Sequence, residues 1–189
     1  YRVEPSRDFR EQGYVLWVGG FQYVPYLLRW LRSHPLAAEL KLLTDVDNPR
    51  AVAAASQLAE ALRLDCEFGT GMRRIDGQAI LPWSETLQAG MMAECRAALD
   101  VKDEADFNQV HKPPAKAQQF VASGIPFATN RGSSAFEYFE RRGFRLALRR
   151  GFLGQDQLGG LFCGVHGSLL YPRSRASRTI RASSTVAVA

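Results

Sequence analysis

Two lysines in the middle of the chain occupy positions that suit a phosphate-bearing ligand. Lys112 comes just before Pro113-Pro114, which open a predicted helix, and Lys116 lies one turn into that helix. The first amides of a helix lack partners within it and carry the positive end of its dipole, so they favour an anion. Two cations beside that end repel one another unless an anion lies between them. The pattern therefore predicts a diphosphate site or, if both lysines point into solvent, an ordinary exposed face.

Two further side chains extend this candidate site. Gln119 lies a turn beyond Lys116 and is predicted to reach a hydroxyl group or the edge of a base. Arg131 follows a predicted strand at residues 125–129 and is predicted to contact a phosphate or a sugar. Either side chain could instead be a solvated surface group, and the sequence leaves that alternative open.

Strand-like and helix-like segments alternate along the chain. Short runs rich in β-branched and aromatic residues predict strands at residues 14–18, 40–46, 65–68, 97–101, 125–129 and 144–148. Apolar residues three and four apart predict helices at residues 25–33, 49–63, 84–96, 113–124 and 134–142. Residues 72–82 fit neither pattern and are interpreted as an irregular crossing.

Residues with capping chemistry mark the helix boundaries. Asn48 and Ser84 precede two of the helices as N-caps, and Ser134 is predicted to form a capping box with Glu137. Gly124 follows the end of another helix, where glycine accepts the left-handed backbone. These signals agree with the segment boundaries drawn from the apolar pattern.

The regular alternation predicts an α/β fold. We expect a Rossmann-like, doubly wound parallel sheet with helices on both faces. Such sheets bind ligands beyond the carboxyl ends of their strands, where the strand order reverses. The loops of interest are therefore residues 19–22, 69–74, 102–112 and 130–134.

Composition divides the chain into three parts. Residues 1–13 are a lead-in, residues 14–150 form the predicted α/β domain, and residues 151–189 are a basic tail of low order. The net charge of +5 comes from the end of the chain, because residues 145–189 hold seven Arg and one acid, Asp156. The remainder is nearly neutral, which argues against nucleic acid as a partner. A native disordered tail and a misjoined reading frame both explain residues 151–189.

Several other chemistries lack their sequence signals. Three cysteines (Cys66, Cys95 and Cys163) and three scattered histidines show no metal-ligand spacing, so no metal is expected. There is no G-x-G-x-x-G, P-loop or G-x-S-x-G motif. No apolar run approaches the roughly 18 residues needed to span a bilayer, and no secretory signal is recognisable. We therefore predict a cytoplasmic protein without a transmembrane segment, and peripheral membrane association stays open.

One segment resembles a known family. The residues from Lys116 to Pro126 read K-x-x-Q-F-x-A-x-G-x-P. This is similar to the K-x-x-E-Y-x-A-x-G-x-P of many GT-B glycosyltransferases, where it belongs to the C-terminal, nucleotide-sugar-binding domain. The order of elements is similar too, from the Gly19-Gly20 turn to the strand beginning at Phe144. The resemblance covers roughly residues 13–148.

The resemblance implies a set of binding residues. Lys116 and the start of its helix would hold the diphosphate of the donor, and Gly19-Gly20 would bring backbone amides close to the phosphates. The loop at residues 69–71, with Arg73-Arg74, would lie beside the base.

Two positions depart from the family pattern. Gln119 stands where the family has a glutamate that accepts bonds from the ribose, and His111 stands where many members carry an acid near the transferred sugar. A neutral amide is a weaker acceptor than a carboxylate. Glu104 or Asp106 could supply a carboxylate from the same loop.

The function implied by the resemblance is glycosyl transfer. A nucleotide diphosphate sugar would be the donor substrate, with no metal or other cofactor, and an N-terminal domain would bind the acceptor. That domain is missing here, because only 13 residues precede Tyr14, so we predict a fragment with weak nucleotide binding and little catalysis. The alternative is a non-catalytic doubly wound module that binds a protein partner, which the loss of both family acids favours.

Overall fold

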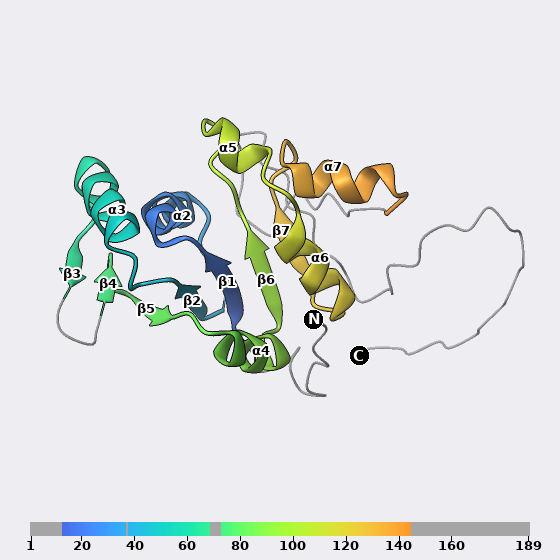
Figure 1. Ribbon diagram of the computed structural model, residues 1–189, viewed down its shortest axis with the longest axis horizontal. Helices are drawn as coiled ribbons and strands as arrows, with labels where there is room; N and C mark the ends of the chain where they lie inside the picture. The colour runs from blue at the N-terminus through green and yellow to red at the C-terminus, as the bar shows by residue number, and fades with distance from the viewer. Residues whose placement is uncertain (1–12, 37, 69–72, 145–189) are drawn as a thin grey trace, which may run out of the picture.

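The computed structural model of the protein describes residues 13–36, 38–68 and 73–144. These residues form a mixed α/β fold around a seven-stranded, mostly parallel sheet (Figure 1). The strands are β1 (Val15–Gly19), β2 (Leu40–Thr44), β3 (Cys66–Phe68), β4 (Arg73–Ile75), β5 (Gln78–Pro82), β6 (Ala97–Asp100) and β7 (Phe127–Thr129). The helices are η1 (Phe21–Tyr23), α2 (Val24–Ser33), α3 (Pro49–Ala61), α4 (Glu85–Glu94), α5 (Phe107–Val110), α6 (Ala115–Ala122) and α7 (Ser134–Arg141).

The strand order creates a reversal beside the first strand. Across the sheet the order is β3-β4-β5-β2-β1-β6-β7, and the five strands from β5 to β7 are parallel. The chain runs from β1 outward through β2 to β5 and then returns to β6 on the other side of β1. The carboxyl ends of these five strands share one edge, which we call the C-terminal edge. Figure 1 shows α5 at this edge, beyond the end of β6.

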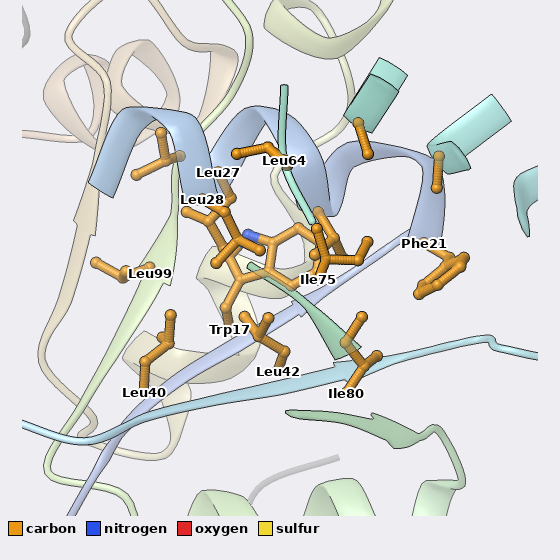
Figure 2. Close-up of a cluster of buried hydrophobic side chains, with 14 of the residues drawn as sticks. Trp17, Phe21, Leu27, Leu28, Leu40, Leu42, Leu64, Ile75, Ile80 and Leu99 are labelled. Carbon is orange, nitrogen blue, oxygen red and sulfur yellow. The ribbon is translucent and has the colours of Figure 1, made fainter. Parts of the chain in front are cut away.

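Alternating side chains of the strands feed two hydrophobic clusters. Trp17 and Leu42 belong to one cluster with Leu27 and Leu28 of α2 and Ala55 of α3 (Figure 2). The other cluster joins the opposite residues of β1, β2, β6 and β7 to α4, α6 and α7, and it includes Leu16, Leu43, Met92, Phe120 and Phe139. Burial on both sides explains why the central strands are almost continuously apolar.

Most of the predicted helix boundaries are confirmed. The Asn48 side chain accepts hydrogen bonds from the amides of Arg50 and Ala51, and Ser84 accepts one from the Leu87 amide at 3.1 Å. Gly124 has a φ of +70° after α6, as expected for a residue that ends a helix.

The third parallel strand was assigned to the wrong segment. The predicted strand at residues 65–68 is β3, which pairs antiparallel with β4, and β4 pairs antiparallel with β5. The third parallel strand is β5, within the segment that we interpreted as an irregular crossing. Asp76 and Gly77 join β4 to β5 with φ values of +52° and +74°. This Asp-Gly pair is a standard hairpin signal that the sequence interpretation overlooked.

Two smaller expectations also need correction. Ser133, rather than Ser134, caps α7 by accepting from the Phe136 amide at 3.2 Å, so the predicted capping box does not form. The short helix α5 was not predicted at all. Four predicted segments lie largely or wholly outside the described residues: the strand beginning at Phe144, the tail, the lead-in to residue 12 and the loop at 69–71. Phe144 is described, and it is in no strand.

We expect Gly19→Ala to destabilise the fold. A Cβ at position 19 would lie 2.0 Å from Cη2 of Trp17, whose ring is buried, so the ring or the strand must shift. Overpacking of this kind costs about 1–3 kcal/mol of the free energy of unfolding, measured by urea denaturation. Gly90→Ala in α4 is the matched control, because nothing lies within 4 Å of its added Cβ. Equal effects of the two substitutions would show that Trp17 does not enforce glycine at position 19.

Candidate functional site

A lysine bridges α6 and β1 at the C-terminal edge. The Nζ of Lys116 donates a hydrogen bond to the Val18 carbonyl at 2.7 Å, although the two residues are 98 positions apart. α6 itself packs against β6 and β7, so the Lys116 side chain extends from there to β1. This is the place where the strand order reverses. Parallel sheets bind their ligands at such a place.

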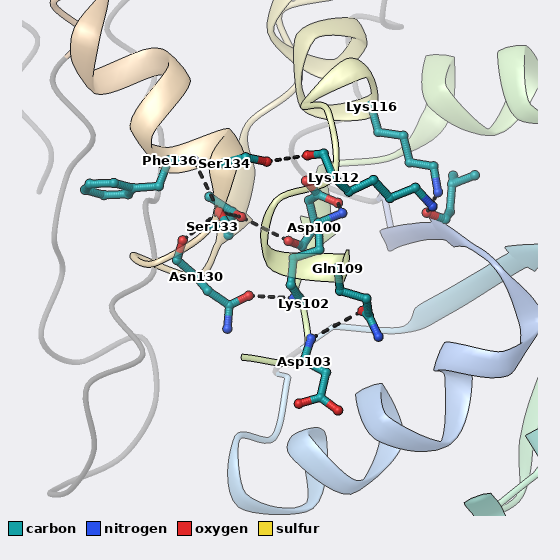
Figure 3. Close-up of polar contacts among 12 residues, drawn as sticks. Asp100, Lys102, Asp103, Gln109, Lys112, Lys116, Asn130, Ser133, Ser134 and Phe136 are labelled. Atoms are coloured by element: carbon teal, nitrogen blue, oxygen red, sulfur yellow. Dashed lines mark hydrogen bonds and ion pairs between the residues drawn. The ribbon is translucent and has the colours of Figure 1, made fainter. Parts of the chain in front are cut away.

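A second lysine approaches the same place. The Nζ of Lys112 lies 5.8 Å from the centre of the Tyr23 ring, which belongs to the η1 turn after β1. Figure 3 shows the side chains of Lys112 and Lys116 running toward one another. The backbone of Lys112 is held by the Ser134 hydroxyl, which donates to its carbonyl. The structure therefore brings together the two lysines that the sequence singled out.

A buried ion pair completes the cationic group. Asp100 ends β6 with 4% of its surface exposed, and its carboxylate contacts the Lys102 ammonium at 2.6 Å. We call Asp100, Lys102, Lys112 and Lys116 the lysine cluster. With its lysines protonated, this cluster carries three positive charges and one negative charge, so an added anion would lower its electrostatic energy.

Burial perturbs the ionisation of Lys116. The pKa of its ammonium is lowered to about 8. Loss of hydration is the main cause, and the charges of Lys102 and Lys112 act in the same direction, while the Asp100 carboxylate opposes them. A bound anion would favour the charged form of Lys116. Anion binding well below pH 8 therefore finds the lysine protonated, whereas binding near or above pH 8 must be accompanied by proton uptake.

Side-chain hydrogen bonds fix the loops around the lysine cluster. The Asn130 side chain accepts from the Lys102 amide at 2.6 Å and donates to the Glu104 carboxylate at 3.1 Å. Thr129 donates to the Asp100 carbonyl at 3.0 Å, and the Ser133 hydroxyl donates to the Asn130 carbonyl (Figure 3). The loops after β6 and β7 are thus tied to each other. This gives the cluster a fixed frame.

Gln119 is held by α4. Its Oε1 accepts a hydrogen bond from Nε2 of Gln88 at 3.2 Å, and Oε1 of Gln88 accepts from the Trp83 indole at 2.7 Å. Gln88 is buried, whereas Trp83 is about half exposed. Gln119 is partly buried and lies three residues after Lys116 on the same helix, so the two side chains share one side of it.

The remaining predicted site residues are arranged differently. His111 is exposed, and its ring lies against Phe107, with the ring centres 4.2 Å apart. Arg131 is exposed after β7 and has no hydrogen-bond or ion-pair partner within the described ranges. Gly19 ends β1 under the Trp17 ring, and Gly20 precedes η1. The glycine turn therefore lies beside the Val18 carbonyl that Lys116 contacts, but the structure gives no such link for His111 or Arg131.

Glu104 and Asp106, which the sequence offered as alternative carboxylates, are both engaged. Glu104 accepts from Asn130, and Asp106 caps α5 by accepting from the amides of Asn108 and Gln109. Asp100 was missed by the sequence interpretation, although its place at the end of a predicted strand could have identified it. The Trp83–Gln88 contact has no comparable local signal.

The described residues offer neither a metal site nor a membrane-spanning helix. No group of three or more His, Cys, Asp or Glu side chains there could hold a metal ion. None of the helices formed by these residues has the length and apolarity needed to cross a membrane. Burial raises the pKa of the Cys95 thiol to about 12, which is far from the range of a reactive thiolate.

Comparison with known proteins gave no match. No protein-family model matched the chain, and no curated protein and no solved structure matched it either.

The lowered pKa of Lys116 has a measurable effect on stability. Between pH 8 and about 10 the folded protein has released this proton while the unfolded chain still binds it, so the free energy of unfolding should rise with pH. We expect wild type to gain about 1–3 kcal/mol over this window relative to Lys116→Met, measured by urea denaturation at each pH. Tyr14 and Cys95, whose pKa values are raised by burial, titrate in both proteins and largely cancel. A constant difference across the window would show that Lys116 titrates normally.

Proposed function

We propose that this chain is the donor-binding half of a GT-B-type glycosyltransferase. It binds a nucleotide diphosphate sugar at the C-terminal edge of the sheet, with the diphosphate between Lys112 and Lys116. The observation that carries the proposal is the position of Lys116, whose partly buried ammonium contacts the end of β1 beside a second lysine. The lysine cluster has three ammonium groups and a single carboxylate, and such an excess of positive charge favours a phosphate ligand.

The arrangement of the sheet supports the proposal. We infer a Rossmann-like, doubly wound domain from the order β5-β2-β1-β6-β7, from the parallel pairing and from the helices in both core clusters. In such a domain the ligand lies at the reversal between β1 and β6, which is where Lys116 meets Val18. The K-x-x-Q-F-x-A-x-G-x-P segment lies on α6, the helix that supplies this lysine.

The chemistry of transfer assigns a clear task to the lysines. When the bond between the sugar and the diphosphate breaks, the departing nucleoside diphosphate gains negative charge. Lys112 and Lys116 offset that charge, and the first amides of α6, for which no side chain acts as a cap, provide further donors. An acceptor bound by a separate N-terminal domain supplies the attacking hydroxyl in this proposal.

A ligand titration tests the proposal directly. UDP, GDP, ADP and inorganic pyrophosphate are titrated separately into the full chain by calorimetry, and chemical shifts are followed by NMR. We expect at least one nucleoside diphosphate to bind, with shifts concentrated at residues of α6 and at the Gly19-Gly20 turn. Absence of binding by all four compounds would overturn the proposal.

A non-catalytic module that binds a protein partner is the second candidate. Two observations favour it. Gln119 and His111 stand where the family carries acids, and the candidate replacements are already engaged, Glu104 by Asn130 and Asp106 by the first amides of α5. The same titration separates the two candidates, because a protein-binding module has no reason to bind any of the four compounds.

A further inference from the structure

Three polar side chains connect α4 to α6 in a fixed direction. An indole N–H is only a donor, so the Trp83 ring requires the oxygen of Gln88 to face it, and their distance is 2.7 Å. The amide nitrogen of Gln88 then faces Gln119 at 3.2 Å, with Met92 Sδ at 3.7 Å as a weaker acceptor. Gln88 is buried, and both ends of its amide are hydrogen-bonded. In a flipped orientation its N–H₂ group would face the indole N–H, so two donors would meet and neither would have an acceptor.

This direction carries through to Gln119. Because Gln88 presents a donor to it, the Gln119 oxygen must face Gln88, and the Gln119 nitrogen must face away. Within the described part of the chain, that nitrogen has no hydrogen-bond partner, and it is not among the buried unpartnered atoms. Gln119 therefore offers a free N–H₂ group on the side of α6 that also carries Lys116.

We infer that Gln119 acts as a hydrogen-bond donor to an oxyanion of the ligand, and that Trp83, acting through Gln88, is the positioning residue that sets this polarity. The inference rests on the proposed function, since it assigns a role within the same site. It reverses the role expected from the family, in which an acid accepts a bond at this position. The ligand group next to Gln119 is accordingly a phosphate oxygen and not a donating hydroxyl.

The test uses inorganic pyrophosphate and substitutions at position 119. Gln119→Glu keeps an oxygen for Gln88 but removes the free donor and adds a negative charge, so pyrophosphate affinity should fall by about tenfold or more. Gln119→Leu removes the donor without adding charge and should lower the affinity by roughly three- to tenfold. Unchanged or increased pyrophosphate affinity in Gln119→Glu would overturn the inference. If wild type binds no pyrophosphate or nucleoside diphosphate, the proposed function fails first, and the inference falls with it.

A second comparison tests the role of Trp83. In Trp83→Phe the donor-only partner of Gln88 is lost, both amides can turn over, and Gln119 can present its oxygen outward. Gln119→Glu should then lower pyrophosphate affinity several-fold less in the Trp83→Phe background than in wild type. A merely structural role of Trp83 would change stability but not this coupling. The same loss in both backgrounds would show that Trp83 does not set the polarity of Gln119.

Discussion

Replacing Lys116 by Met should separate binding from stability. Under the proposed function, loss of the ammonium removes a charge-assisted contact to the diphosphate. Such a contact is worth about 1–3 kcal/mol, or roughly a 5- to 150-fold loss of affinity for the nucleoside diphosphate that binds best. The protein itself should become as stable as wild type or more stable at pH 7. The reason is that Met fills a similar volume without the cost of burying a charge, a cost reflected in the lowered pKa of Lys116.

A lysine elsewhere on the sheet provides the matched control. Lys41 lies on β2 with its ammonium 3.9 Å from the Tyr14 ring, toward the start of β1 and away from the C-terminal edge. Lys41→Met changes the net charge equally and should leave the affinity within about twofold. If both substitutions weaken binding to the same extent in calorimetric titrations, a general charge effect replaces the site-specific interpretation.

Removing the carboxylate at position 100 should destabilise the fold strongly. Asp100 is buried and paired with Lys102, so Asp100→Asn leaves a largely buried ammonium facing a neutral amide. Breaking a buried pair from one side costs about 3–5 kcal/mol of the free energy of unfolding, which urea denaturation can measure. Lys116 loses its nearby carboxylate in the same change.

Two comparisons show whether burial causes this loss. Glu137 and Arg141 form an exposed ion pair at 2.8 Å on α7, and Glu137→Gln should cost no more than about 0.5 kcal/mol. Asp100→Asn combined with Lys102→Met removes both members of the buried pair and should recover much of the loss. An Asp100→Asn protein as stable as Glu137→Gln would mean that the buried pair contributes little.

Capping residues in the sequence correctly predicted several helix boundaries. Asn48, Ser84 and Gly124 each act within one helical turn of the chain, and each lies at a helix boundary in the structure. The error at β5 has a similar local origin, because the Asp76-Gly77 turn was readable but was not used. The sequence did not indicate that β5 joins the parallel sheet beside β2 while β4 and β3 extend the sheet as antiparallel strands. Such pairing depends on strands that are distant in the sequence.

The site was predictable only in part for the same reason. Lys112 and Lys116 were identified because they flank a helix start, a feature visible in neighbouring residues. The contact of Lys116 with Val18 and the bond between Gln88 and Gln119 join residues 98 and 31 positions apart. No spacing rule encodes such contacts. The assumed role of Gln119 as an acceptor depended on an amide orientation that only the Trp83 contact determines.

The distances in sequence also bear on how the molecule folds. The β4–β5 hairpin joins immediate neighbours across Asp76-Gly77, whereas Val15 pairs with Ala97 and Lys116 reaches back to Val18. Closing a longer loop costs more chain entropy before any contact repays it. We therefore expect the hairpin edge to form early and the lysine cluster to assemble late. Substitutions in the cluster would then act mainly by accelerating unfolding, with little effect on the rate of folding.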